Sequence, residues 1–587
     1  MAKNFNKPGV KNLPEGASSQ FHKGQKQWYV FFPYCFNIDG KRFQERDYIG
    51  KIVGDEFVPN AYYIDHHPDK DHRPLHRWKH PEKARREREK AEKLKLGEAA
   101  PKRPVEDYRD GETYEKSVGA SALVMKCLYG NGTVRHLGND ALGGDVRMTA
   151  DTLNVAIHTA TTRRPNYLAE DDSFVTKYVG KGCPSSQRIS ELHTRLGSIP
   201  QLEEKLSAGL CSELSKDDLL ALDGTKVDCN SKGIDLSALG KRKDGTYGTQ
   251  ITFSTLFNAT TGRSLGYRLY AGNLHDVRTL EDYMHLWEAF GVPDTGATVI
   301  ADRAYYHEDM LAQIGSRGIG FVIGAKTNLN CVREVIKARA EEFRWPENRI
   351  ANGCSGVSSP VTLRSENYTI QGHLFVYLDR NRQVQEVDGF YKSLNDFAEK
   401  WRHMPEQDPD LIPKHLREFY ISPSPGLPLV IDRYAAIEHG ESLGFFAFVS
   451  NVVSDVKQCY EYYTYRNEVE VYFKQTRKNG FKSTHVHSDA ALKGYALTMF
   501  VGTSATMEIM FRKRGKDLDG CSVDEILSKL SKVTLERTAE GEVYLKNVTR
   551  KEKELVAKLG FAGLFDSAQE VEKLLSARHL AEYLNKS

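Results

Sequence analysis

Three acidic residues that are far apart in the sequence have neighbours suited to metal-dependent phosphoryl transfer. Asp223 ends the apolar run LLALD, Asp302 ends the apolar run TVIAD, and Glu470 lies among tyrosines and cations in YYTYRNEVEVYFKQTRKNG. Each aspartate is predicted to close a buried strand, and strand ends at the rim of a mixed sheet often carry ligand chemistry. Two carboxylates held close together repel unless a proton or a cation neutralises them. Hard oxygen ligands of this kind favour magnesium or manganese.

The stretch around Glu470 is predicted to form one continuous helix. At about 100° per residue, four side chains lie within roughly 40° of Glu470 around the axis: Tyr463, Arg466, Lys474 and Arg477. A neighbouring apolar stripe can pack on a sheet: Tyr462, Val469 and Phe473. An acid that binds metal, beside cations that reach phosphate, is what phosphoryl transfer needs.

A plainer interpretation of this helix is a solvated surface. Glu–Arg and Glu–Lys pairs four residues apart are common there and contribute only tenths of a kcal/mol, on the order of 0.2–0.5 kcal/mol each. The helix alone favours this interpretation. The two strand-ending aspartates reverse the preference.

The elements that must hold these acids follow one another as β-β-β-α-β-α-β from residue 219. Apolar and β-branched runs predict the strands, and apolar residues at helical spacing predict the helices. We therefore predict an α/β catalytic core in two parts, residues 206–326 and 445–512, separated by an inserted, mainly-β domain at 327–444.

Other segments flank this core. Residues 1–110 contain 23 lysines and arginines against 17 acids, a net charge of +6, and begin with a predicted small β-meander. A polar loop with five histidines and a charged linker helix are predicted to follow, up to residue 98. Residues 111–205 are predicted to be helical and to bind DNA, and residues 513–587 to form a helical tail.

The composition is that of an ordinary soluble globular protein, with 40% hydrophobic and 27% charged residues among 587. No apolar run is long enough to span a membrane, and the N-terminus does not resemble a secretory signal. These features predict a cytoplasmic protein without membrane partners. The nine cysteines are scattered and form no CxxC pair, which predicts reduced thiols.

At these residues the sequence resembles the DDE transposases of bacterial insertion sequences, in particular the insertion-sequence-4 group with its Y-(2)-R-(3)-E-(6)-K signature. Tyr463, Arg466 and Glu470 match its spacing, with Arg477 at the lysine position. LALDGT and IADRAYY are similar to the strands of the first and second aspartates. YRLYAGNLHDVRTL is similar to the GN..D..TL segment between them.

The resemblance implies an RNase H-like core and two Mg²⁺ or Mn²⁺ ions held by Asp223, Asp302 and Glu470. It also implies phosphate contacts from Tyr463, Arg466 and Arg477, with Lys474 beside them. The expected reaction is cleavage of double-stranded DNA at the terminal inverted repeats of an element, followed by strand transfer into target DNA. The expected assembly is a homodimer acting in the bacterial cytoplasm at the nucleoid.

Three alternatives remain at this stage. One is an RNase H-like nuclease that cuts DNA without joining it, and another is an inactive derivative that only binds DNA. A glycosidase-type acid pair is the third. The cations near Glu470 and the basic N-terminus count against the last.

Overall fold

The computed structural model describes residues 9–14, 16–22, 27–38, 41–60, 63, 106–109, 111–242, 246–274, 276–290, 292–421, 424 and 426–586. The chain divides into two compact units, Met1–Arg103 and Pro104–Ser587. The predicted histidine-rich loop and charged linker helix lie outside the described residues.

The first unit contains an antiparallel sheet of four strands in the order β1-β2-β3-β4. The strands are β1 (Ser18–His22), β2 (Gln27–Ile38), β3 (Lys41–Val53) and β4 (Glu56–Pro59). Val30, Phe32, Ile49 and Ile52 form the centre of its small apolar core. The predicted β-meander is confirmed.

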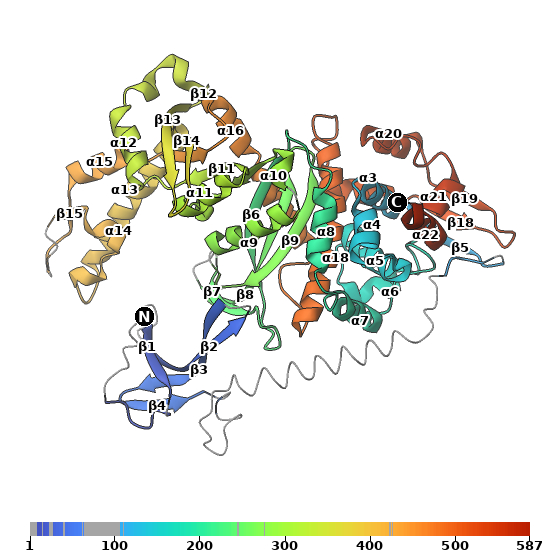
Figure 1. Cartoon of the computed structure of the whole chain (residues 1–587), viewed down its shortest axis with the longest axis horizontal. Coiled ribbons are helices and arrows are strands. Elements are labelled where there is room, and N and C mark those ends of the chain that lie inside the picture. The colour runs from blue at the N-terminus through green and yellow to red at the C-terminus, as the bar shows by residue number, and fades with distance from the viewer. Residues whose placement is uncertain are drawn as a thin grey trace. The chain divides into compact units, whose positions relative to one another are not determined.

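The second unit is built on a mixed sheet of ten strands (Figure 1). Three strands are antiparallel neighbours: β6 (Leu219–Asp228), β8 (Tyr247–Asn258) and β9 (Arg263–Ala271), with the short β7 (Ala238–Lys241) also on β8. On the other side of β6, β10 (Thr298–Ala301) and β11 (Gly320–Ala325) run parallel to it. Every residue of β10 and β11 is buried, as parallel strands covered on both faces require. The predicted α/β core is confirmed.

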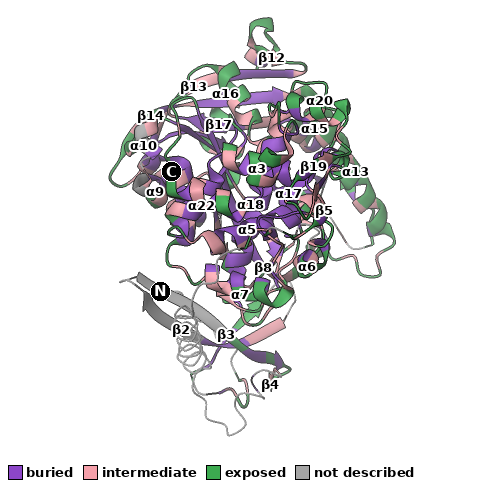
Figure 2. Cartoon of the chain, turned by 90° about the vertical axis from the view of Figure 1, so that its right-hand side faces the viewer, coloured by how far each residue is buried: buried purple, intermediate pink, exposed green. Residues whose placement is uncertain are grey.

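The core helices lie between and after these strands. They are α9 (Asp276–Ala289), α10 (Val292–Thr295), α11 (Glu308–Ser316), α16 (Val456–Thr464), α17 (Asn467–Lys478) and α18 (Asp489–Arg512). Helix α18 lies in the purple interior of Figure 2, with 18 of its 24 residues buried. A helix that is apolar on all sides must be covered by other elements on all sides.

A helical region before the core supplies part of this cover. It comprises α3 (Gly119–Gly130), α4 (Thr133–Arg135), α5 (Val146–Thr162), α6 (Ala169–Asp172), α7 (Ser186–Leu196) and α8 (Leu202–Cys211). Helix α7 crosses α18 so closely that a Cβ on Gly494 would lie 2.0 Å from the backbone oxygen of His193. Only glycine allows this approach.

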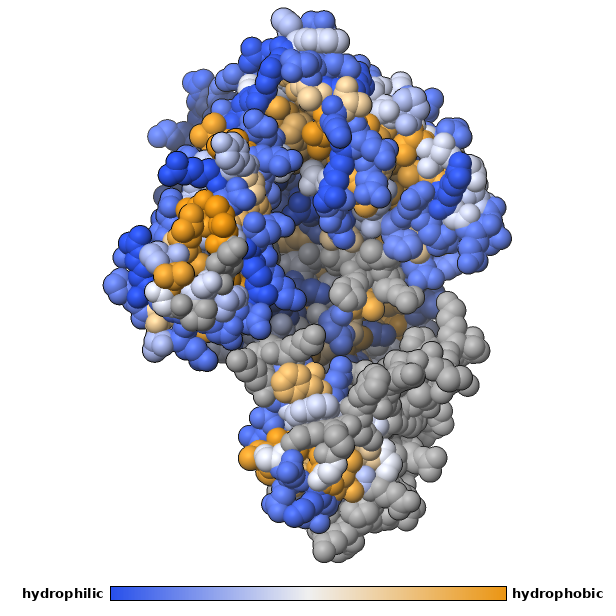
Figure 3. All heavy atoms as spheres, turned by 90° about the vertical axis from the view of Figure 1, so that its left-hand side faces the viewer, coloured by the Kyte–Doolittle hydropathy of each residue, from blue (hydrophilic) through white to orange (hydrophobic). Residues whose placement is uncertain are grey.

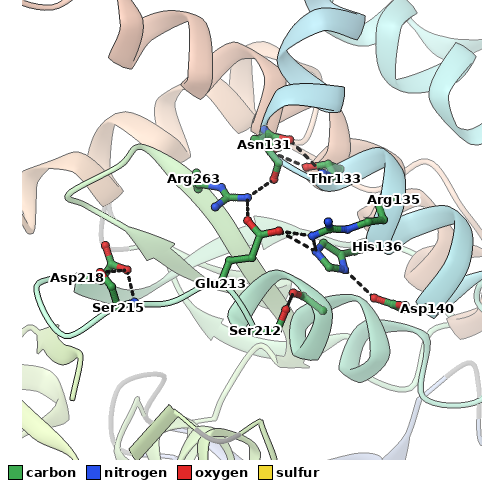
Figure 4. Close-up of polar contacts among 12 residues, drawn as sticks. Asn131, Thr133, Arg135, His136, Asp140, Ser212, Glu213, Ser215, Asp218 and Arg263 are labelled. Atoms are coloured by element: carbon green, nitrogen blue, oxygen red, sulfur yellow. Dashed lines mark hydrogen bonds and ion pairs between the residues drawn. The ribbon is translucent and has the colours of Figure 1, made fainter. Parts of the chain in front are cut away.

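Figure 4 shows a polar junction between the helical region and the core sheet. The Glu213 carboxylate accepts a hydrogen bond from Arg263 Nη2 at 2.6 Å and another from Arg135. Arg263, the first residue of β9, also donates to the backbone oxygen of Asn131 at 2.6 Å. Burial alone would raise the pKa of Glu213, but the two guanidinium groups lower it. The junction therefore holds the carboxylate charged.

The C-terminal segment differs from the predicted helical tail. It contains α19 (Val523–Leu530), α20 (Arg550–Lys558), α21 (Ala568–Leu574) and α22 (Ala577–Lys586), but also strands β18 (Thr534–Arg537) and β19 (Val543–Lys546). Strand β18 pairs with β5 (Tyr114–Ser117), which lies more than 400 residues earlier in the numbering. The region is mainly helical, as predicted, and its two strands were not predicted because four residues are too short to show an alternating pattern.

The prediction of a mainly-β insertion at 327–444 is also wrong. Its strands β12 (Arg349–Ala351), β13 (Cys354–Arg364) and β14 (Thr369–Asp379) extend the core sheet through β17 (Phe445–Ser450). The rest is largely helical: α12 (Asn330–Ala338), α13 (Arg380–Arg402), α14 (Lys414–Arg417) and α15 (Arg433–Glu441), with two-residue strands β15 (Tyr420–Ile421) and β16 (Val430–Ile431). Helix α13 was not predicted, although apolar residues recur along it at helical spacing from Val387 to Trp401.

Helices α13 to α15 enclose a separate apolar core that includes Leu394, Trp401 and Phe419. They lie at the opposite end of this unit from α3, α5 and α22 (Figure 1). Figure 3 faces that end and shows hydrophobic patches scattered among hydrophilic side chains.

None of the helices in the described ranges has the length and apolar content that a membrane crossing requires. The cysteines that the structure describes with their side chains are free thiols.

Candidate active site

Asp223 and Asp302 lie next to each other on neighbouring parallel strands. The pairing of β6 with β10 ends with Leu222 opposite Ala301, so the two aspartates follow at the same level. Asp302 comes directly after β10, as predicted, and its Oδ1 accepts a hydrogen bond from the backbone nitrogen of Arg303 at 2.6 Å. Asp223 lies inside β6 rather than at its end, because pairing with β8 continues to Asp228.

The predicted continuous helix around Glu470 is two helices. Helix α16 ends at Thr464 and α17 begins at Asn467. Around this break, the backbone nitrogens of Tyr465, Arg466, Glu468 and Val469 donate to carbonyls three residues earlier rather than four. This tighter backbone places Tyr463 on α16 and Arg466 before the first turn of α17. Val469 and Phe473 are buried, as the predicted apolar stripe requires.

The guanidinium group of Arg466 contacts all three predicted acids. Its Nη2 lies 3.1 Å from Asp223 Oδ2 and 3.2 Å from Asp302 Oδ2. Its Nη1 lies 3.5 Å from Glu470 Oε1. Strand register and the start of α17 thus bring residues 223, 302 and 470 around one cation.

The three acids differ in burial, and this sets their electrostatics. The side chain of Asp223 is 17% exposed, that of Asp302 32% and that of Glu470 64%. Burial raises the pKa of Asp223, although Arg466 and the Gly224 amide oppose the shift. Burial would lower the pKa of Arg466, but Asp223 and Asp302 raise it. The arginine is therefore firmly charged.

Tyr463 fixes the other side of Asp302. Its hydroxyl donates to Asp302 Oδ1 at 3.4 Å, and its ring stacks on Phe448 with the centroids 3.9 Å apart. Burial, with a contribution from the Asp302 charge, raises the pKa of Tyr463 to about 12. The phenol is thus a neutral hydrogen-bond donor near neutral pH.

The two remaining predicted phosphate contacts lie further along α17. Arg477 Nη2 donates to Thr225 Oγ1 at 2.6 Å. Thr225 is two residues after Asp223, so both side chains lie on the same face of β6. Lys474 is exposed. A cationic edge therefore continues from the three acids along the helix.

In the part of the chain that the structure describes, no group of three or more His, Cys, Asp or Glu side chains is arranged to hold a metal ion. The three acids surround the Arg466 guanidinium instead. Their oxygens are nevertheless the hard donors that Mg²⁺ and Mn²⁺ prefer, and they already converge on a positive charge. The donor set fits a divalent ion, provided that Arg466 moves away.

The sequence motifs did not reveal the groove beside Asp302. A cavity of about 380 Å³ lies there, with Arg303, Arg382, Phe446 and Tyr460 among its lining residues. Arg382 and Phe446 lie on α13 and β17, and no motif included them. Gly324 was also missed: a Cβ there would lie 2.6 Å from the backbone nitrogen of Arg303.

Comparison with known proteins gives one family. Residues 214–501 match the family model described as "Transposase DDE domain". No curated protein matches the chain significantly. A cryo-EM structure of a piggyBac transposase synaptic complex with hairpin DNA is similar at 10% identity and a TM-score of 0.33, covering 81% of this chain and 87% of that one. The match covers just under half of the chain and leaves segments on both sides of it unmatched.

Proposed function

We propose that this protein is a cut-and-paste DNA transposase of the insertion-sequence-4 type, acting as a homodimer in the bacterial cytoplasm. It would cleave double-stranded DNA at the terminal inverted repeats of its element and join the freed ends to target DNA. The observation that carries the proposal is the convergence of Asp223, Asp302 and Glu470 on one guanidinium group. An RNase H-like core is supported by the strand order β9-β8-β6-β10-β11, in which three antiparallel strands are followed by two parallel ones.

In this mechanism Asp223, Asp302 and Glu470 would hold two Mg²⁺ or Mn²⁺ ions. Such ions would activate a water or a DNA 3′-hydroxyl as the nucleophile and would stabilise the charge on the leaving 3′-oxygen. Tyr463 orients Asp302 through its hydroxyl. Arg466 neutralises the charge of Asp223 and Asp302 while no metal is bound. Once metal ions neutralise these carboxylates, the guanidinium can bind a DNA phosphate.

Arg477 and Lys474 extend the cationic edge along α17 and would contact the DNA backbone beyond the scissile phosphate. Arginine suits this role because its planar fork matches phosphate bidentately. Lys474 is exposed and free to act as a point charge.

The test is an in vitro reaction with DNA carrying the inverted repeats that flank the gene. We expect cleavage at the repeat ends and strand-transfer products in Mg²⁺ or Mn²⁺, both abolished by Asp302→Asn with end binding retained. Cleavage without joined products would identify a nuclease instead. End binding without cleavage by the unmodified protein would identify an inactive derivative, and cleavage by Asp302→Asn would refute the site.

A further inference from the structure

Helix α17 is anchored at both ends by residues from outside the DDE domain match. In its first turn, the half-buried Glu468 pairs with Arg514, which follows α18. In its last turn, Lys478 Nζ lies 2.9 Å from Asp524 Oδ2, in the first turn of α19. Residues 514 and 524 come after the matched range, which ends at 501.

The second anchor is a network rather than a single pair. Arg163, at the C-terminal end of α5, reaches Asp524 Oδ1 through Nη2 at 2.9 Å and Nε at 3.1 Å. The same Nη2 lies 3.4 Å from Gln475 Oε1 on α17. Burial would raise the pKa of Asp524, but Lys478 and Arg163 lower it, so this carboxylate stays charged. One carboxylate thus ties α5 and α19 to α17.

Glu470 is the acid whose position depends on this helix. Asp223 and Asp302 are held by the register of β6 and β10. Glu470 is the most exposed of the three acids. Its distance to the Arg466 guanidinium, 3.5 Å, is longer than those of Asp223 and Asp302, 3.1 Å and 3.2 Å. A small rotation or shift of α17 would therefore move Glu470 and leave the aspartates where they are.

We propose that Asp524 and Arg514 are positioning residues, which hold α17 so that Glu470 meets the two sheet aspartates. This inference rests on the proposed function. Exposed single ion pairs contribute little to stability, but Asp524 is shared by two cations and Arg163 is only 19% exposed. The segments flanking the DDE domain would then complete its active site without contacting substrate.

The experiment compares Asp524→Ala with Asp517→Ala in the full chain. Asp517 lies in the segment between α18 and α19, is 89% exposed and pairs with Lys558 on the surface. The first measurement is amide hydrogen exchange of α17, which needs neither metal nor DNA. We expect exchange in Asn467–Lys478 to be about threefold to tenfold faster in Asp524→Ala and unchanged in Asp517→Ala.

The second measurement is the Mn²⁺ concentration that gives half-maximal cleavage of end DNA. We expect about a tenfold increase in Asp524→Ala, with unchanged end binding and with recovery in Asp524→Glu. Lys478→Gln breaks the Lys478–Asp524 ion pair by changing the other partner. We expect the same increase in exchange and in Mn²⁺ requirement, so this variant serves as the test if Asp524→Ala does not fold.

The outcomes separate this inference from the proposed function. If the unmodified protein cleaves and neither Asp524→Ala nor Lys478→Gln changes the exchange or the Mn²⁺ requirement, the positioning role is wrong. If exchange in α17 rises but the unmodified protein never cleaves DNA, the anchor stands and the transposase proposal fails.

Discussion

Removing the Arg466 guanidinium should make the metal-free protein less stable and tighten its binding of divalent ions. In Arg466→Gln, Asp223 and Asp302 would lie on adjacent strands with no cation between them. Breaking a fully buried ion pair costs about 3–5 kcal/mol. These acids are 17% and 32% exposed, so we expect a loss of about 2 kcal/mol in the free energy of unfolding.

The same contacts predict the effect on metal affinity. In the unmodified protein an incoming ion must displace the arginine from both aspartates, whereas in Arg466→Gln it need not. A difference of about 2 kcal/mol corresponds to roughly 30-fold tighter binding of Mn²⁺. An ion at 100 times its dissociation constant stabilises a folded protein by about 2.7 kcal/mol, enough to recover the loss. DNA cleavage should nevertheless fall, because the proposed phosphate contact is gone.

The assay is urea unfolding in EDTA and again across a Mn²⁺ titration. Lys474→Gln is the matched control, because it removes a cation from the exposed side of the same helix. Equal stability of Arg466→Gln and the unmodified protein in EDTA would refute the reasoning. So would equal Mn²⁺ dissociation constants, since the arginine and the ion would then not compete for the same oxygens.

Further predictions concern three other positions. Gly324→Ala should abolish metal-dependent cleavage while the protein stays folded, because the added Cβ would lie 2.6 Å from the backbone that follows Asp302; wild-type rates would contradict this. Arg477→Ala should weaken the binding of end DNA by about 1 kcal/mol and reduce the salt dependence of that binding. Thr225→Val is its control: it removes only the hydroxyl that Arg477 donates to, so the salt dependence should not decrease. Burial lowers the pKa of His193 to about 4, so the unfolded chain gains a proton first as the pH falls. Stability should therefore drop by about 3 kcal/mol between about pH 6.5 and pH 4, and His193→Gln should flatten that part of a urea-unfolding series.

The strands that carry Asp223 and Asp302 could be predicted from sequence because their signals are local. The runs around Asp223 and Asp302 are continuously apolar, as buried parallel strands must be, and each acid interrupts its run. The position of Asp302 after β10 follows from that pattern alone. The predicted strand ends at Asp223 instead of Asp228, because the continuation of β6 depends on pairing with β8, which is a tertiary contact.

Features that depend on distant partners could not be predicted. Nothing near Arg466 indicates that its guanidinium lies among three acids, because two of them are more than 160 residues earlier. The pairing of β5 with β18 and the Asp524 network likewise join segments from opposite ends of the chain. Helix α13 is a different case: apolar residues recur at helical spacing from Val387 through Leu394 to Trp401, so the local pattern was sufficient to predict it.

Helices outside residues 214–501 pack directly against the segment that the family model matches. Helix α18 extends to Arg512, beyond the end of the DDE match, and packs against α3, α5 and α7 from the preceding helical region. A fragment limited to residues 214–501 would end in the middle of α18. It would also expose the side chains of α18 that pack against α3, α5 and α7. Each large apolar side chain exposed in this way costs about 1.5–3 kcal/mol, against a total stability of about 5–15 kcal/mol for a typical protein. A few such side chains, such as Tyr495, whose ring lies 5.5 Å from that of His193 on α7, would remove much of that margin. The three acids lie within the residues that the family model matches, whereas the compact unit that contains them spans residues 104–587.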